Sequence, residues 1–296
     1  MVEIKNNKYS GSVSGEAVIK EPIELADQSS RMKFKNLMPR DIKLLRINLP
    51  QELAGSHLDL TLDIKLDSGE KYEDVKNNVY MTAIAMMDRA PVIDGKLDFG
   101  EWNKQMPMVI NNESQVKLNP DWTGPDDLSA KVYCAYDKDN FYLAAEVTDD
   151  IMCDEDSLAR AWAVDSIQFS FAKANVASAA ITEYGIAQVN GEAKVDRYSF
   201  IGVNEGIMME KDVNTFEGVE LEVKREGNKT IYESKFPWKQ IYYNDITDIT
   251  KLDEVYFSLL INENDGEGRK GWLEYCAGIG EGKNAALFIP VMLNKK

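Results

Sequence analysis

Histidine is almost absent from this 296-residue chain, which contains only His57. A zinc site built on several histidines is therefore excluded, and a Ser-His-Asp triad could use no other histidine. Cysteine is scarce as well, since Cys134, Cys153 and Cys276 are the only three and none lies close to another. An odd number leaves at least one free thiol, and we expect these cysteines to be small buried apolar residues.

The chain also lacks long hydrophobic runs and any surplus of basic residues. No apolar stretch approaches the roughly 20 residues that a membrane-spanning helix needs, and no signal peptide is visible at the start. The 50 acidic residues outnumber the 34 basic ones, which gives a formal net charge of −16. Such a chain repels phosphate backbones and anionic membranes, so we expect neither nucleic-acid binding nor membrane insertion. Neutral sugars and divalent cations are better suited to such a surface than anionic ligands are.

Short strands dominate the first part of the sequence. The composition changes near Asp88–Pro91, which divides the chain into modules at 1–87 and 88–296. His57–Leu66 alternates between apolar and polar residues and ends at a hairpin-type turn, Asp67–Gly69. Further strands are predicted at Gly15–Ile19, Lys43–Leu49 and Asn78–Met86. Short strands over about 80 residues are typical of an immunoglobulin-like β-sandwich.

The second module is β-rich too, with hairpins predicted around the turn-rich segments Asp137–Asn140 and Arg225–Asn228. Strands are predicted at Ala130–Tyr136, Phe141–Val147, Ser166–Phe171, Val219–Val223, Thr230–Phe236, Val255–Ile261 and Leu287–Met292. Helical signal is weak and is confined to short turns at Phe99–Asn103 and Pro237–Ile241. The sequence therefore predicts an all-β protein of two sandwich modules, the second of jelly-roll type.

Several motifs follow one another in a fixed order within residues 88–296. They are Pro91–Asp98, Glu101-Trp102, Val132–Asp137, Asn140–Leu143, Val147–Asp150, Trp162–Phe169, Tyr232–Trp238 and Asn262–Gly266. Together they resemble carbohydrate-binding module family 9 and its relatives, which share a DOMON-like β-sandwich. The resemblance implies a non-catalytic, extracellular module that keeps an attached glycoside hydrolase near a polysaccharide. The first module is similar, by pattern only, to immunoglobulin-like accessory domains of such enzymes.

The resemblance further implies a site in which two tryptophans clamp a terminal sugar. Trp162 matches the first of these tryptophans, and Gln168 falls where a glutamate that accepts sugar hydroxyls is expected. Asp165, between them, is a further candidate for carbohydrate binding, and Trp122, in a turn-rich loop, is an alternative stacking platform. The other three tryptophans lie beside predicted elements and are expected in the core: Trp102, Trp238 and Trp272.

Part of the implied sugar site is missing. Gly185 and Ala187 stand where an arginine and an asparagine are expected, and Gly280–Ala285 lacks the second tryptophan. A structural or cell-surface interaction module that has lost sugar binding therefore remains the main alternative.

Acidic clusters raise the question of calcium, which the resemblance also implies. Asp149–Asp156 contains five carboxylates, and Asp150, Asp154 and Asp156 are the candidate ligands. A solvated acidic loop explains the same run. Asn262–Gly268 half-resembles a calcium loop, and a tight turn between strands explains it equally well.

Two other functions have little support in the sequence. A glycosidase needs a defined pair of carboxylates, and no signal selects a pair among 50 acidic residues. A haem domain with Met and His ligands would have to use His57, which lies in the other module. We therefore predict a non-catalytic module that binds a polysaccharide or oligosaccharide.

Overall fold

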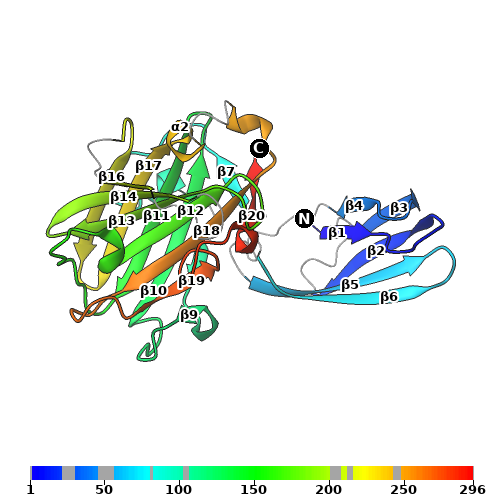
Figure 1. Ribbon diagram of the computed structural model, residues 1–296, viewed down its shortest axis with the longest axis horizontal. Helices are drawn as coiled ribbons and strands as arrows, with labels where there is room; N and C mark the ends of the chain where they lie inside the picture. Colours follow the sequence, from blue (N-terminus) through cyan, green and yellow to red (C-terminus); the bar gives the residue numbers. More distant parts are fainter. Residues whose placement is uncertain are drawn as a thin grey trace. The chain divides into compact units, whose positions relative to one another are not determined.

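The protein is nearly all β in the residues that its computed structural model describes. These residues are 2–21, 31–45, 57–80, 83–102, 107–200, 208–211, 216–242 and 248–295. They form two compact units, Met1–Met81 and Thr82–Lys296, which are treated separately below (Figure 1). The described helices span only three to five residues each, for example α1 (Phe99–Trp102) and α2 (Trp238–Tyr242). The predicted all-β class is therefore confirmed. None of the described helices is long and apolar enough to span a bilayer.

The first unit contains a four-stranded antiparallel sheet in the order β3-β2-β5-β6 and a two-stranded sheet, β1-β4. Its strands are β1 (Val2–Lys5), β2 (Val13–Glu21), β3 (Arg31–Leu37), β4 (Ile42–Leu45), β5 (His57–Leu66) and β6 (Lys71–Tyr80). The alternation of β5 puts Leu60 and Leu62 into a core that also receives Ile4 from the small sheet. The part of the predicted strand Lys43–Leu49 beyond β4 lies outside the described residues. Immunoglobulin-like topology stays a prediction for this unit.

The division between the units falls earlier than the predicted boundary at 87/88. The prediction of a single strand over Asn78–Met86 was wrong, because β6 ends at Tyr80 and a separate strand, β7 (Ala83–Met86), follows. β7 pairs in parallel with β20 (Ile289–Asn294) and with β10 (Leu128–Tyr136). Residues 83–86 therefore belong to the sheets of the second unit.

The second unit is a β-sandwich whose two layers are joined along one edge through β7 (Figure 1). The strands run in the order β15-β14-β13-β12-β18-β20-β7-β10-β11-β17-β16, with β19 added to β18 and β8 to β10. Besides β7, β10 and β20, they are β8 (Met108–Ile110), β9 (Val116–Lys117), β11 (Asn140–Asp149), β12 (Ser166–Ala172), β13 (Ile181–Val189), β14 (Glu192–Phe200), β15 (Met208–Lys211), β16 (Glu220–Glu226), β17 (Lys229–Pro237), β18 (Glu254–Glu263) and β19 (Gly271–Cys276).

An aromatic core lies between the two layers. Phe169 and Phe171 of β12 alternate inward, as predicted, and Phe141 of β11 meets them from the opposite layer at centroid distances of 5.8 and 5.0 Å. Burying each such ring contributes about 1.5–3 kcal/mol to folding. The three tryptophans assigned to the core are indeed buried, at 0–4% exposure: Trp102, Trp238 and Trp272. Of the three free thiols, those of Cys134 and Cys276 are buried and that of Cys153 is partly exposed.

The buried carboxylate of Glu233, on β17, anchors the segment that opens the second unit. Its Oε2 accepts hydrogen bonds from the backbone N–H groups of Asp94, Gly95 and Lys96 at 2.8–3.1 Å. Its Oε1 accepts one from Trp102 Nε1 at 3.1 Å. Gly95 has φ of +74°, a conformation that L-residues with a Cβ rarely adopt, so the turn depends on glycine. One side chain thus fixes both the 91–98 loop and α1.

Glu233→Ala should destabilise the protein by about 3 kcal/mol or more, because it leaves two buried and two partly buried donors without an acceptor. Urea unfolding monitored by tryptophan fluorescence measures this loss. Glu222 lies directly opposite on β16 and is exposed, so Glu222→Ala serves as the matched control and should change stability little. Equal effects of the two substitutions would contradict the anchoring role.

Candidate functional site

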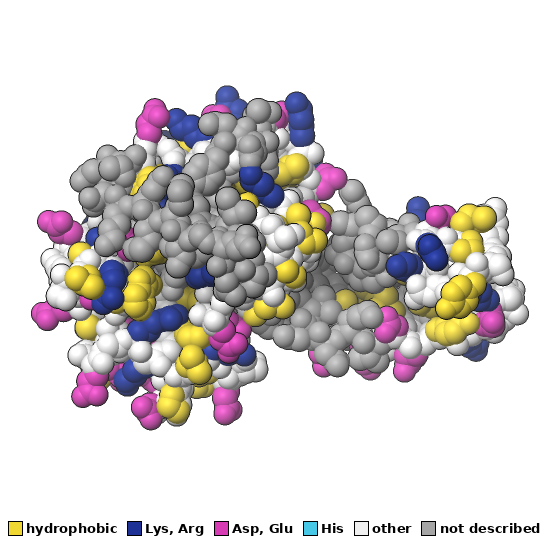
Figure 2. All heavy atoms as spheres, viewed as in Figure 1, with side chains coloured by type: hydrophobic (Ala, Val, Ile, Leu, Met, Phe, Trp, Pro, Cys, Tyr) yellow, Lys and Arg dark blue, Asp and Glu magenta, His cyan; other side chains and the backbone are white. Residues whose placement is uncertain are grey.

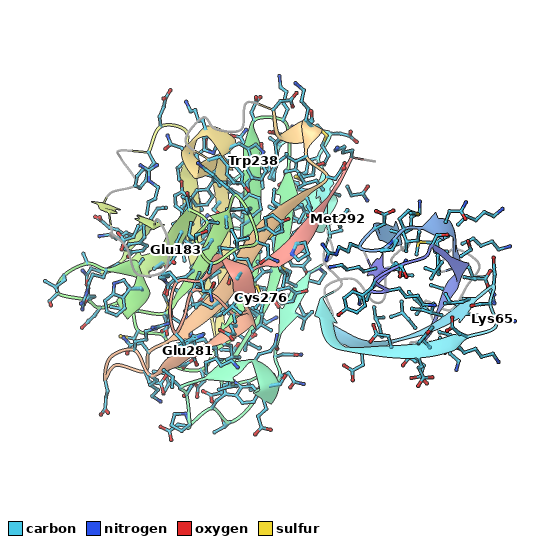
Figure 3. All side chains as sticks on the ribbon, turned by 45° about the vertical axis from the view of Figure 1, so that its right-hand side comes forward. Lys65, Glu183, Trp238, Cys276, Glu281 and Met292 are labelled. Atoms are coloured by element: carbon cyan, nitrogen blue, oxygen red, sulfur yellow. The ribbon has the colours of Figure 1, made fainter. Side chains whose placement is uncertain are left out.

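The side chains of one sheet that point away from the aromatic core form a mostly polar and largely buried layer, here called the outer face. The register pairs Gln168 of β12 with Gly185 of β13 and with Leu260 of β18, so alternate residues of these strands share this side. Its members are Gln168, Ser170, Glu183, Asp196, Tyr198, Leu260, Asn262, Trp272 and Glu274. Figure 3 labels Glu183 among these strands.

A continuous chain of polar contacts crosses the outer face. Lys283 Nζ donates to Glu183 Oε2 at 2.6 Å, and Gln168 Nε2 donates to Glu183 Oε1, also at 2.6 Å. On its other side Gln168 accepts from Asn262 Nδ2 at 2.8 Å, and Asn262 Oδ1 accepts from Arg269 Nε at 2.7 Å. Gln168 is 6% exposed, so both ends of its amide serve the network. The groups that can still reach a ligand are the two cations at its ends, both partly exposed.

Trp162 lies at the edge of the outer face and is half-buried. It packs on an apolar cluster that includes Leu260, Trp272 and Tyr198, while the Arg160 guanidinium stands over its ring at 4.7 Å. Arg160 is itself held by Asp156, with Nε and Nη2 donating at 3.0 and 2.8 Å. The indole is therefore available to a ligand over part of its surface only.

The short helix that carries Trp162, η5 (Ala161–Ala163), is pinned at both ends. Its first N–H donates to Asp196 Oδ2 at 2.8 Å, and its last carbonyl accepts from Asn264 Nδ2 at 2.7 Å. A Cβ at Gly185 would lie 3.2 Å from Ala161, so η5 fills the space above that position. The missing arginine there is thus explained by packing.

Trp272, which was predicted to lie in the core, lies on the outer face and is covered by Arg269 and Gly280. The guanidinium of Arg269 stands 4.5 Å above its ring, and its Nε1 donates to Glu274 Oε2 at 3.1 Å. Gly280 packs so closely that a Cβ there would come within 2.4 Å of the indole. The loop expected to supply a second tryptophan instead supplies a glycine that makes room for one from β19.

The other predicted binding residues lie elsewhere. Trp122 is half-buried, and its Nε1 donates to the Leu128 carbonyl at 2.9 Å, so it holds its own loop. Asp165 is 4% exposed, and its carboxylate accepts from the backbone N–H groups of Cys153 and Asn264. It therefore positions the segment after Trp162 and does not reach the outer face.

The three predicted calcium ligands are not brought together. Asp156 is bound to Arg160, which holds the pKa of its carboxyl down at about 2. Asp154 accepts from Gln188 and from the Gly191 N–H, and Asp150 is exposed. As placed, the His, Cys, Asp and Glu side chains of the described ranges include no group of three or more that could hold a metal ion.

Four other carboxyl groups lie close together at the end of the sandwich: Asp149, Asp165, Glu263 and Asp265, here called the buried acid group. Burial, strengthened by mutual repulsion, raises the pKa of Asp149 to about 6 and that of Asp165 to about 8. Burial and the nearby Asp265 carboxyl raise the pKa of Glu263 to about 10. Neither carboxyl oxygen of Glu263 has a hydrogen-bond partner among the described residues, so nothing offsets the cost of ionising it.

Sequence reasoning missed three residues of the polar network that crosses the outer face, namely Glu183, Arg269 and Lys283. Glu183 belongs to β13, which was not predicted, and the two cations lie in loops read only for calcium or for a tryptophan. One local signal was present: Asn190-Gly191, with φ values of 51° and 84°, is the kind of two-residue turn that joins β13 to β14 in a hairpin.

Comparison with known families decides the relationship. Residues 93–296 match the family described as carbohydrate family 9 binding domain-like. The chain belongs to this family. Family 9 modules are non-catalytic carbohydrate-binding modules, and the match covers the sandwich with the outer face.

Solved structures similar to this family 9 module include two from Caldicellulosiruptor kristjanssonii. One is a family 9 module in complex with cellotriose, with a TM-score of 0.47, 17% identity, and coverage of 72% of this chain and 94% of that one. The other, in complex with glucose, has a TM-score of 0.46, 18% identity, and coverage of 72% and 96%. A proposed carbohydrate-binding protein from Bacteroides uniformis ATCC 8492 has a TM-score of 0.47, 10% identity, and coverage of 65% and 88%. No curated protein matches this chain.

Proposed function

We propose that the second unit binds a sugar on its outer face, without catalysis, and that the ring of the sugar stacks on Trp162. The observation that carries this is a partly exposed indole beside a network that ends in two partly exposed cations, on a family 9 module. A pyranose presents an apolar C–H face to an indole, and its hydroxyls can accept from arginine and lysine.

Weak binding is expected, because much of the polar network is already satisfied within the protein. The Gln168 amide donates to Glu183 and accepts from Asn262, and Arg160 covers part of Trp162. We expect dissociation constants from high micromolar to millimolar, or about −4 to −6 kcal/mol.

Isothermal titration of the full chain with a panel of soluble mono- and oligosaccharides tests the proposal. Saturable heat with at least one neutral or charged sugar supports it. No heat with any member would favour the structural or surface-interaction alternative. Release of new reducing ends from an oligosaccharide would instead indicate a glycosidase.

The wider role follows from the same proposal. A family 9 module that binds sugar weakly is useful when joined to a catalytic module, because a tethered site raises the local concentration of substrate. We propose that this chain works outside the cell beside a glycoside hydrolase, with which it shares a polysaccharide.

Calcium binding also stays a proposal for this unit. The run Asp149–Asp156 carries five carboxylates, whose oxygens are the ligands that calcium takes, and Asp150, Asp154 and Asp156 are the candidate ligands. We therefore expect calcium to raise the melting temperature and a chelator to lower it. Calorimetric melting with calcium and with excess chelator measures both shifts. Identical curves with and without chelator would argue for a solvated acidic loop instead.

A further inference from the structure

The two cations of the outer face depend on a single carboxylate. Lys283 is paired with Glu183 at 2.6 Å, and Glu183 is 1% exposed. Glu183 is also the acid whose charge acts on Arg269. One buried negative charge therefore faces two positive charges.

Arg269 is the less well satisfied of the two cations. Its Nε donates to Asn262, but its Nη2 is buried and has no hydrogen-bond partner in the described part of the chain. It forms no ion pair with a described residue, and its guanidinium carbon stands 4.5 Å from the centre of the Trp272 ring. A guanidinium always stays charged, so the cost of its partial burial is not removed by losing a proton.

Arg160 is a comparable arginine that does have an acidic partner. It also stacks on a tryptophan, at 4.7 Å, yet it is bound through both Nε and Nη2 to Asp156. The chain has ample acid for a second such pair, with 50 acidic against 34 basic residues. Figure 2 shows the two signs interspersed over the visible face of the second unit. The unpaired state of Arg269 is thus a local feature of the outer face.

We propose that the ligand of this site is an acidic sugar, whose carboxylate accepts from Arg269 and whose ring stacks on Trp162. This rests on the proposed function and adds the class of sugar. A planar guanidinium matches a carboxylate in geometry as well as charge, and Lys283 adds a second positive charge at the same face. A hydroxyl of a neutral sugar can accept one hydrogen bond from the exposed part of the Arg269 guanidinium but leaves the charge without compensation.

Glucuronic acid and glucose form the sharpest pair of probes, since they differ only at C6. The full chain is titrated with each in low salt, and the indole N–H resonances are followed by NMR. We expect glucuronate to bind about tenfold more tightly than glucose, the value of one charge-assisted hydrogen bond. Glucose 6-sulfate and glucose 6-phosphate distinguish a carboxylate from other anions, and we expect both to bind more weakly than glucuronate.

Arg269→Gln removes the charge and should reduce the preference for glucuronate over glucose to about twofold or less. Lys138, 75% exposed in the β10–β11 turn, provides the control, and Lys138→Gln should keep the full preference. Circular dichroism melting of each variant establishes that it is folded. Since the preference is a ratio, a general loss of affinity in a weakened variant does not imitate the expected result.

Equal affinity for glucose and glucuronate would overturn the acidic-sugar proposal and leave the proposed function standing. Tighter binding of the sulfate or phosphate ester would overturn the choice of a carboxylate. A preference that survives Arg269→Gln would show that this arginine does not recognise the acid. Failure of every sugar to bind would instead contradict the proposed function itself.

Discussion

Trp162→Ala is expected to abolish sugar binding, raising the dissociation constant beyond measurement. The half-buried indole is the stacking surface in the proposed site, and a methyl group replaces none of its area. Because the indole also packs on the cluster around Leu260, we expect a stability loss of about 1–2 kcal/mol as well. Isothermal titration with the best-binding sugar of the panel, combined with thermal melting, separates the two effects.

Trp122→Ala is the matched control. Trp122 is the other partly exposed tryptophan, and its indole is tied to the Leu128 carbonyl, away from the outer face. It should retain binding while losing a comparable amount of stability. The reverse pattern, with binding lost in Trp122→Ala and kept in Trp162→Ala, would move the site to the Trp122 loop.

The protein is expected to be more stable at pH 5 than at pH 9, with the unfolding free energy falling most steeply at the acidic end of this range. The pKa values of Asp149, Asp165 and Glu263 are raised to about 6, 8 and 10, so the folded chain keeps protons that the unfolded chain releases above about pH 4.5. For each of these groups the stability therefore falls as the pH rises, until the folded pKa is passed. Urea denaturation across this range, with chelator present, measures the slope.

Glu263→Gln tests the source of that slope. An amide keeps the shape of the neutral carboxyl and cannot ionise, so the variant should lose stability less steeply and exceed the original protein at pH 9. Glu226, exposed on the edge strand β16, gives the control, and Glu226→Gln should leave the slope unchanged. A Glu263→Gln profile that runs parallel to that of the original protein would assign the slope to other groups.

The alternation of β5 made that strand predictable, whereas β13 was missed. In β5 the alternation was clear because one face meets the core and the other is polar. The first seven of the nine residues of β13 are buried in an unbroken run, because η5 and neighbouring loops cover the side of the strand that faces away from the core. A strand buried on both faces loses the period-two signal, so β13 was not predicted.

The candidate site was only partly predictable for a related reason. The division of the five tryptophans into three buried and two partly exposed was confirmed, since each has local context in the sequence. The contacts of Glu183 with Gln168 and Lys283 join three separate elements. Such contacts depend on the register between neighbouring strands. That register could not be inferred from the sequence, because β13 itself was not predicted.

The parallel pairing of β7 bears on how the second unit acquires its structure. β7 is its first strand, yet the pairing of Ala83 with Met292 means that one of its partners is its last described strand. During synthesis β7 emerges long before β20, and closing so long a loop is slow compared with forming a hairpin such as β10–β11. Until then the backbone groups of β7 have no partner on that side. An unpaired edge of this kind can recruit other chains, so the nascent unit should be most prone to aggregation just before β20 arrives.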